Sequence, residues 1–137
     1  MRATARRTTP NTFTHRVDVR HHQLTVDEPL EDGGDDEGVS PQELLAASLA
    51  SCTAVTIEMY AKRKGWDLGP VEVQCDYQPA ERGCVTTFRV RLRLPSTCTQ
   101  EQAEKLRVIA AKCPVHRTLE GEVMFDDRIE IVTPAAT

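Results

Sequence analysis

Residues 41–66 read PQELLAASLASCTAVTIEMYAKRKGW and form the longest apolar stretch of the sequence. Between Leu44 and Ala61 the only charged residue is Glu58. Apolar residues recur at helical spacing on several sides of the segment, which is typical of a helix buried inside a structure. The serines and threonines can bond carbonyl groups of the helix itself. The stretch therefore predicts a long central helix with Cys52 near its middle.

Both ends of this segment carry helix-boundary signals. Ser40 is a favourable N-cap, Pro41 suits the first helical position, and Glu43 adds negative charge to the first turn. The basic residues 62–64 and then Gly65 close the other end. The unbroken apolar length is short of about 20 residues and the end is basic, so we expect no membrane span.

Composition restricts the classes of protein that fit. The chain has 137 residues, which is the size of a single domain with a core of its own. A net charge of −4 without a long basic run argues against nucleic-acid binding. We expect residues 1–12 to be a disordered basic tail and residues 13–137 to form one domain. No apolar run marks a signal peptide, so we expect a reducing cytoplasm, where five cysteines are not a disulfide framework.

Two short strands are expected before the long helix. Residues 13–19 and 23–28 alternate apolar and polar positions, and residues 20–22 connect them tightly. The loop that follows has seven carboxylates in residues 27–37. It lacks the alternating oxygen ligands before a glycine that a calcium loop requires, so we interpret it as a solvated loop.

A β-hairpin is predicted after the helix. Residues 71–78 and 84–94 alternate and are joined by a turn at PAERG, residues 79–83. Pairing Cys75 with Phe88 would set the acidic and amide side chains of one strand against the arginines of the other. We therefore interpret the arginine row as a solvated, cross-paired face, and Cys75 and Cys84 as small core residues.

The C-terminal third predicts two helices and a last strand. Thr99 and Gln102 have the spacing of a capping box, before an amphipathic helix that ends ahead of Cys113. Cys113 is a plausible N-cap for a short helix that begins at Pro114. Residues 121–132 alternate and indicate a final strand or hairpin. Strands, long helix, hairpin, helix and strand in this order predict an α+β fold.

Two cysteines have surroundings suited to chemistry. Cys52 is in the middle of the long helix, and Cys113 lies beside Lys112 and just before His116 and Arg117. A helix N-terminus and nearby cations lower the pKa of a thiol. Cys113, His116 and Cys52 have the donor types of a zinc site, but no second half-site exists, so we expect no metal. Nucleotide-binding loops and the serine-hydrolase motif are absent, and no cofactor is expected.

The stretches VDEPLEDGG, SPQELLAASLASCTAVTIEMYAKRKGW and CPVHRTL together resemble the OsmC/Ohr family of thiol-dependent hydroperoxide peroxidases. The likeness runs from about residue 15 to residue 132. It implies that Cys52 is the peroxidatic cysteine and Cys113 the resolving one, and that an external dithiol reduces their disulfide. It also implies the OsmC-like fold, an intertwined homodimer in which a long helix and a second helix pack against antiparallel sheets.

The resemblance extends to two further candidate residues. Family peroxidases have a glutamate directly after the proline that opens the long helix; here that position is Gln42, and the carboxylate follows at Glu43. One residue corresponds to about 100° of helix rotation. The family also uses an arginine from the N-terminal strands, for which Arg20 is the candidate, with Arg16 behind it. The motifs P-x-E-L-L and YAKRKGW, at the two ends of the helix, resemble those of the OsmC-like branch of the family.

Two functions are therefore expected as alternatives. The first is an antioxidant peroxidase for organic hydroperoxides, alkyl or lipid, because an apolar pocket gains about 0.8 kcal/mol for each buried CH₂ of a substrate tail. The second is an OsmC-like protein that senses redox state or binds a small apolar ligand without efficient turnover. The displaced carboxylate at Glu43 motivates the second.

Overall fold

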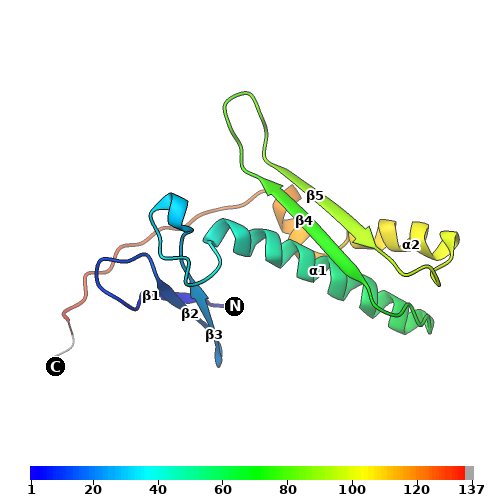
Figure 1. The fold of residues 1–137 in the computed structure, drawn as a ribbon, viewed down its shortest axis with the longest axis horizontal. Helices are drawn as coiled ribbons and strands as arrows, with labels where there is room; N and C mark the ends of the chain where they lie inside the picture. Colours follow the sequence, from blue (N-terminus) through cyan, green and yellow to red (C-terminus); the bar gives the residue numbers. More distant parts are fainter. Residues whose placement is uncertain (135–137) are drawn as a thin grey trace.

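The computed structural model describes residues 1–134 and contains two antiparallel sheets and a set of helices around one long helix (Figure 1). This is the predicted α+β architecture. The N-terminal sheet has the order β1-β2-β3, and the second sheet is the hairpin β4-β5. The elements are β1 (Thr4–Arg7), β2 (His15–Val19), β3 (His22–Val26), the 3₁₀ turn η1 (Leu30–Asp32), α1 (Pro41–Lys64), β4 (Glu72–Gln78), β5 (Thr87–Arg93), α2 (Gln100–Ala110) and α3 (Pro114–Glu120).

The boundaries of α1 confirm the signals found in the sequence. The Ser40 hydroxyl accepts the Glu43 amide at 3.1 Å, and the Glu43 carboxylate accepts the Ser40 amide at 2.9 Å. This is a reciprocal capping box with Pro41 in the first helical turn. At the other end Gly65 adopts the left-handed conformation, with φ of 71°, and closes the helix.

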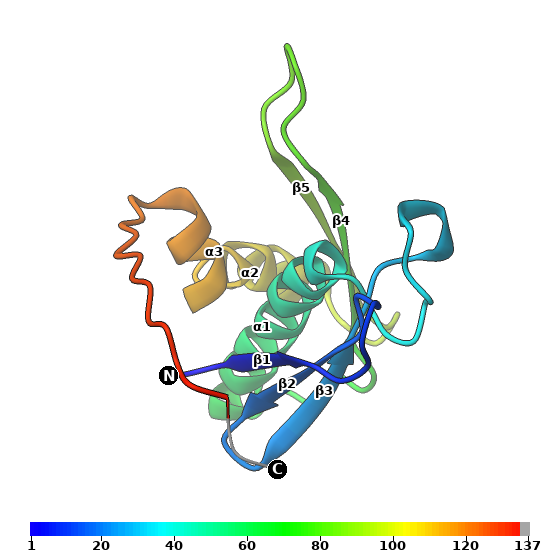
Figure 2. The ribbon, with the colours of Figure 1, turned by 90° about the vertical axis from the view of Figure 1, so that its left-hand side faces the viewer.

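The core forms where α1 meets the hairpin and α2. Buried side chains of α1, led by Ile57, pack against Leu106 of α2 and Leu68, while β4 and α3 also contact the helix (Figure 2). α1 has 24 residues and is apolar enough, by length and composition, to cross a membrane. The packing of sheet and helices against one of its faces identifies α1 as the central helix of the domain.

A second side of α1 is apolar but uncovered. Val55 and Met59 lie on this side and have 52% and 63% of their surface exposed. The N-terminal sheet lies near one end of α1 and has few contacts with it (Figure 2). Within one chain, the long helix is therefore covered on one face only.

The hairpin pairs two residues out of the predicted register. Cys75 lies opposite Val90 instead of Phe88, and Glu72 lies opposite Arg93. The physical reason is the turn, which is tightened around Arg82 and Gly83 by hydrogen bonds between Glu81 and Cys84. A short turn fixes strand register, and an even shift leaves each side chain on its predicted face.

The two ends of the chain differ from the prediction. The tail expected to be disordered contains β1, whose Arg6 forms a 3.1 Å ion pair with Asp18 of β2. Residues 121–134 form no strand, and run outward from α3 (Figures 1 and 2). The expected final strand is thus not formed, because no strand of the same chain pairs with it. Its exposed apolar residues are Val123, Met124, Phe125, Ile129, Ile131 and Val132.

A buried carboxylate holds the acidic loop to the N-terminal sheet. Asp27 is 1% exposed and accepts hydrogen bonds from the Thr14 hydroxyl at 2.8 Å, the Glu28 amide at 2.7 Å and the Glu37 amide at 3.2 Å. Burial acts to raise the pKa of Asp27, but these hydrogen bonds together outweigh it, so the pKa lies below its ordinary value.

Acid is expected to weaken the fold through Asp27. The lowered pKa means that the stabilisation is complete above the ordinary value of about 4 and is lost as the pH falls through the folded-state value. In Asp27→Asn we expect a lower Tm at neutral pH and a flatter fall of Tm below about pH 4. Thermal unfolding across pH tests this, with Glu31→Gln in the same loop as the control. An unchanged acid profile in Asp27→Asn would contradict the role.

Candidate functional site

Cys113 begins α3 and is completely buried. Its backbone is extended, with φ of −62° and ψ of 143°, and its sulfur accepts the backbone N–H of His116 at 3.2 Å. Pro114 follows in the first turn of α3. These contacts confirm the prediction that Cys113 caps this short helix.

The packing of α3 on α1 brings Cys52 beside Cys113. The Cys52 thiol lies close enough to the Cys113 thiol to raise its pKa, and both are free thiols. Cys52 is half-buried at the edge of the covered face of α1. The next residue, Thr53, is buried and donates its hydroxyl to the Cys113 sulfur at 3.8 Å. The two predicted cysteines thus form one pair with one accessible and one buried thiol.

The electrostatics of Cys113 differ from the expectation. Burial is the largest influence and raises the pKa of the Cys113 thiol, and the neighbouring Cys52 raises it further. The hydrogen bonds from His116 and Thr53 act in the opposite direction but do not outweigh burial. Lys112 and Arg117 are exposed, so they do not supply the cationic contact that the sequence suggested. The ordinary state of Cys113 is therefore the protonated thiol.

Glu43 and Arg20 are not joined to the thiols. Glu43 is held in the cap of α1 by Ser40, and these hydrogen bonds lower the pKa of its carboxyl. It lies nine residues before Cys52, a rise of about 13 Å along the helix. Arg20 is exposed in the β2–β3 turn with a positive φ of 54°. Within residues 1–134, no hydrogen bond or ion pair connects either residue to Cys52 or Cys113.

The other three cysteines lie apart from the pair. Cys75 is half-buried on β4, where burial, and then the charge of Asp76, raise the pKa of its thiol. Cys98 donates weakly to the Thr99 carbonyl at 3.6 Å in the link before α2. Cys84 is exposed at the hairpin turn, so the prediction that it is a core residue is wrong. The turn at Arg82–Gly83 places Cys84 outside β5, beyond the part of the hairpin that covers α1.

His116 lies beside Glu120 on α3. Its Nδ1 lies 3.1 Å from a carboxylate oxygen of Glu120, one turn later on α3, but not in the direction of a hydrogen bond. In the described part of the chain, no three His, Cys, Asp or Glu side chains come together as metal ligands. The Cys-x-x-His spacing is explained by the cap, in which the amide of His116 meets the sulfur of Cys113.

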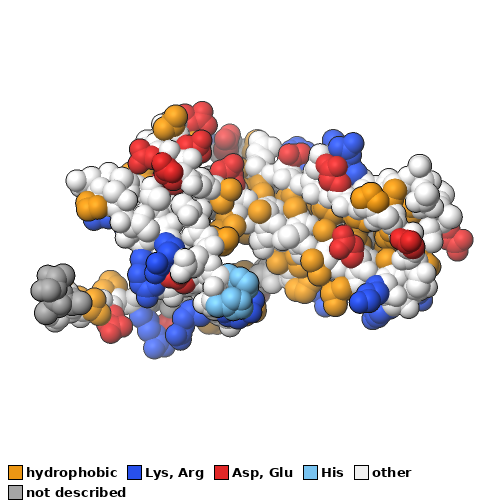
Figure 3. Space-filling view, turned by 60° about the horizontal axis from the view of Figure 1, so that its bottom comes forward, with side chains coloured by type: hydrophobic (Ala, Val, Ile, Leu, Met, Phe, Trp, Pro, Cys, Tyr) orange, Lys and Arg blue, Asp and Glu red, His pale blue; other side chains and the backbone are white. Residues whose placement is uncertain are grey.

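An apolar hollow of about 500 Å³ opens on the same side of α1 as Cys52. Thr56 and Met59, four and seven residues after Cys52, line it together with Ile109 of α2. The rest of its wall consists of Tyr60, Lys62, Arg63 and Lys112. Figure 3 shows apolar side chains spread over the helical half of one face of the molecule and toward the N-terminal sheet.

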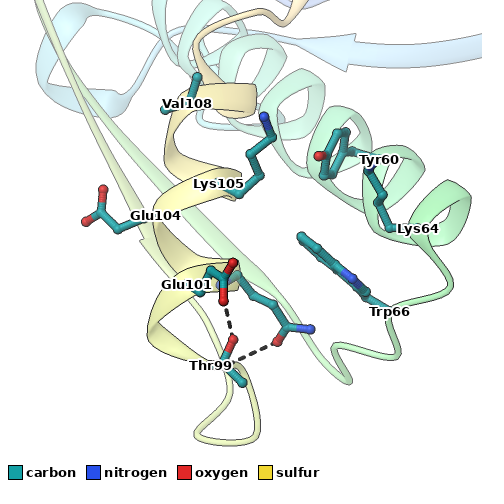
Figure 4. A pocket seen from close by; sticks show the side chains of 9 residues that line it. Tyr60, Lys64, Trp66, Thr99, Glu101, Glu104, Lys105 and Val108 are labelled. Carbon is teal, nitrogen blue, oxygen red and sulfur yellow. Dashed lines mark hydrogen bonds between the residues drawn. The ribbon is translucent and has the colours of Figure 1, made fainter.

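A second hollow lies farther along α1 and shares Tyr60 with the first, and neither hollow is lined by Cys52 or Cys113. It measures about 680 Å³ and is formed where Tyr60 and Trp66 face Lys105 of α2 (Figure 4). The two aromatic rings meet edge to face with centroids 5.6 Å apart. The capping box of α2, Thr99 with Gln102, closes one end and confirms the predicted helix start. The candidate site is therefore the thiol pair itself, with the hollow of Thr56 and Met59 on the same side of α1 as Cys52.

Thr53 is the residue that sequence reasoning missed. The threonines and serines of α1 were expected to bond carbonyls of their own helix, as Ser51 does with Ser48 at 3.1 Å. Thr53 instead reaches another element, at the sulfur of Cys113. Its position between Leu49 and Ile57, each four residues away, is the signal that places it in the most buried stripe.

Comparison with solved structures identifies the fold. A putative osmotic stress induced and detoxification response protein from Psychrobacter arcticus 273-4 has a TM-score of 0.71 at 20% identity, over 84% of this chain and 86% of that one. An OsmC like protein from Mycoplasma pneumoniae has a TM-score of 0.70 at 18% identity, over 88% and 86%. The organic hydroperoxide resistance protein OhrB of Bacillus subtilis has a TM-score of 0.60 at 21% identity, over 88% and 90%.

Sequence comparison gives the family. No curated protein is matched by sequence. The family model described as OsmC-like protein matches residues 34–126, which include the whole of α1, the hairpin, α2 and α3. Both cysteines of the pair lie inside the matched region. The chain therefore belongs to the OsmC-like protein family, as its sequence motifs predicted.

Proposed function

We propose that this protein is a cytoplasmic, thiol-dependent peroxidase that reduces organic hydroperoxides through Cys52 and Cys113. The observation that carries the proposal is that a partly exposed thiol, Cys52, lies near a buried one, Cys113, whose sulfur is bonded to the next residue of the same helix, Thr53. The accessible thiol can meet a substrate, and the buried thiol can meet only its neighbour. Family membership and neighbours named organic hydroperoxide resistance proteins support the same reading.

The proposed reaction has three steps: oxidation of Cys52, formation of the disulfide, and its reduction. The Cys52 thiolate attacks the outer oxygen of the hydroperoxide, the O–O bond breaks, and the alcohol leaves after taking a proton. The Cys113 thiol then loses its proton, and its thiolate attacks the sulfur of the Cys52 sulfenic acid. An S–S bond forms, the S–O bond breaks, and the leaving hydroxide takes up a proton and becomes water. An external dithiol exchanges with this disulfide, is itself oxidised, and returns both thiols.

The surroundings of Cys52 favour a substrate with an apolar tail. The hollow on the same side of α1 has Met59 and Ile109 in its wall, and each CH₂ buried there contributes about 0.8 kcal/mol. An alkyl or lipid hydroperoxide gains this contribution, whereas hydrogen peroxide has no tail to bury. Specificity for organic hydroperoxides thus follows from the apolar wall.

Turnover of tert-butyl hydroperoxide in the presence of a dithiol tests the proposal. We expect many equivalents to be consumed per protein, faster than hydrogen peroxide. Protein whose thiols have been alkylated beforehand is the control for the uncatalysed reaction. Consumption at the rate of this control, by protein with intact thiols, would rule out a peroxidase.

A second function has one observation in its favour. Within one chain, Glu43 is bonded in a helix cap and Arg20 is exposed in the β2–β3 turn, so neither contacts Cys52 as the family's glutamate and arginine are expected to do. A redox sensor, or a binder of a small apolar ligand, needs no such contact. It would show a single stoichiometric oxidation of Cys52, or a hydrophobic molecule retained through purification and visible by mass spectrometry.

We also propose that the protein works as a homodimer. Val55 and Met59 leave one side of α1 apolar and exposed, and the C-terminal segment adds six more exposed apolar side chains. An uncovered stripe on the central helix is accounted for when a second copy of the chain covers it. The first of these surfaces reaches the hollow on the Cys52 side of α1, which Met59 also lines.

Light scattering at micromolar concentration is expected to give twice the mass of the chain. Met59→Glu should weaken the dimer, because it would bury a charge in the interface. Val85→Glu, at a still more exposed apolar position on the hairpin loop, 80% against 63% for Met59, is the control and should leave the dimer intact. A folded monomer of the unaltered protein would contradict the proposal.

A further inference from the structure

The Thr53 hydroxyl has an unusual partner for a buried helical residue. Thr53 is 1% exposed, so its hydroxyl is costly to bury without a hydrogen bond. A threonine inside a helix commonly bonds the carbonyl of the residue four positions earlier. Here the hydroxyl donates to Cys113 Sγ at 3.8 Å, and no second partner occurs among residues 1–134.

A weak acceptor does not explain why a hydroxyl is kept in this position. A neutral thiol is a poor hydrogen-bond acceptor. Valine has nearly the shape of threonine without the polar atom, and would fill the same place between Leu49 and Ile57 without the cost of burying a hydroxyl. The hydroxyl becomes strongly stabilising only when the sulfur is a thiolate, because hydrogen bonds to a charged group are about twice as strong.

The two donors to this sulfur come from different elements. Thr53 approaches from α1, and the His116 amide approaches from α3 at 3.2 Å. Because Thr53 is the residue after Cys52, its hydrogen bond ties the Cys113 sulfur to the same turn of helix that carries Cys52. Water cannot stabilise the fully buried Cys113, so these donors are the groups that can.

We propose that Thr53 is a positioning residue for the second step of the reaction, holding the Cys113 sulfur against Cys52 and stabilising it as it becomes a thiolate. The inference rests on the proposed peroxidase function. In that step the Cys113 thiolate bonds to the Cys52 sulfur, the S–O bond of the sulfenic acid breaks, and hydroxide leaves and takes up a proton. Thr53 gives up no proton and touches no substrate.

Two substitutions separate the hydroxyl from the shape of the side chain. Thr53→Val keeps the shape and removes the donor, and Thr53→Ser keeps the donor and removes a methyl group. After one equivalent of tert-butyl hydroperoxide, we expect the disulfide to form about tenfold more slowly in Thr53→Val, the loss of one hydrogen bond to a charged group. Thr53→Ser should restore most of the rate, and the first oxidation of Cys52 should be unchanged in both.

Titration of Cys113 gives a readout that does not depend on peroxide. In a Cys52→Ser background, the ultraviolet absorbance of the thiolate should titrate at a higher pKa when Thr53 is valine, and close to the parent when it is serine. The Tm of Thr53→Val should equal or exceed that of the parent, which excludes a fold defect. The role of Thr53 is overturned if Cys113 titrates at the same pKa with valine as with threonine at position 53. It is also overturned if serine and valine slow disulfide formation equally.

Failure of the proposed peroxidase function and failure of the role of Thr53 give different results. If the unaltered protein shows no hydroperoxide-dependent oxidation of Cys52, the proposed function fails, whatever Thr53 does. If Cys52 is oxidised and the disulfide forms equally fast in Thr53→Val, the peroxidase stands and the role of Thr53 is overturned.

Discussion

Cys52→Ser is expected to lower the consumption of organic hydroperoxide by about a thousandfold or more, to the rate of the uncatalysed reaction. The hydroxyl of serine is not ionised at neutral pH and does not attack a peroxide, so the nucleophile is lost while the shape is kept. Cys113 does not replace it, because its sulfur is completely buried and its pKa is raised. The measurement is turnover of tert-butyl hydroperoxide with a dithiol.

Cys84→Ser is the matched control for this change. Cys84 is exposed at the hairpin turn and has no thiol beside it, so its loss should leave turnover unchanged. Substantial activity in Cys52→Ser, or an equal loss in Cys84→Ser, would show that another group carries the reaction.

Cys113→Ser is expected to keep the first oxidation and lose the second. Serine is a good N-cap and still accepts the His116 amide, so α3 should remain folded. The sulfenic acid on Cys52 then has no neighbouring thiol to trap it, and excess hydroperoxide drives it to the irreversible sulfinic acid. Turnover with a dithiol should fall at least about tenfold and decline further with each addition of peroxide.

Mass spectrometry of intact Cys113→Ser should detect one added oxygen atom after one equivalent of hydroperoxide and two after excess. The unaltered protein should instead lose two hydrogen atoms, as a disulfide does. If Cys113→Ser resists over-oxidation and cycles as fast as the unaltered protein, Cys113 is not the resolving cysteine.

Local sequence signals predicted the helices well. Ser40 with Glu43 and Thr99 with Gln102 both form the capping boxes that their spacing indicates, and Cys113 caps α3. These signals succeed because a cap depends on residues three positions apart, which stay close in any fold that contains the helix. The start of each helix could therefore be predicted from the sequence alone.

Features that depend on distant residues were predicted less well. The hairpin register was wrong by two residues because the sequence places the turn only within residues 79–83, whereas the hydrogen bonds between Glu81 and Cys84 fix the pairing. Residues 121–132 alternate like a strand but form none, because alternation says nothing of whether a partner edge is present. β1 was missed for the opposite reason, since its polar sequence shows no alternation although β2 offers it an edge.

The prediction of the candidate site also succeeded for local features and failed for features that depend on distant residues. Cys52 and Cys113 were singled out by their positions on helices and by the family resemblance, and α1 and α3 do bring them together. The sign of the pKa shift at Cys113 was wrong because the sequence shows nearby cations but not complete burial. Thr53 was missed because the partner of its hydroxyl lies 60 positions away in the chain.

Peptide mapping after one equivalent of organic hydroperoxide tests the central claim most directly. Protein is oxidised, its remaining thiols are alkylated, and the digest is searched for linked cysteine peptides. We predict one link, between Cys52 and Cys113, with Cys75, Cys84 and Cys98 still reduced. Cys52 oxidised beyond the sulfenic acid without this link, or a link through any of the other three cysteines, would contradict a two-cysteine mechanism at this site.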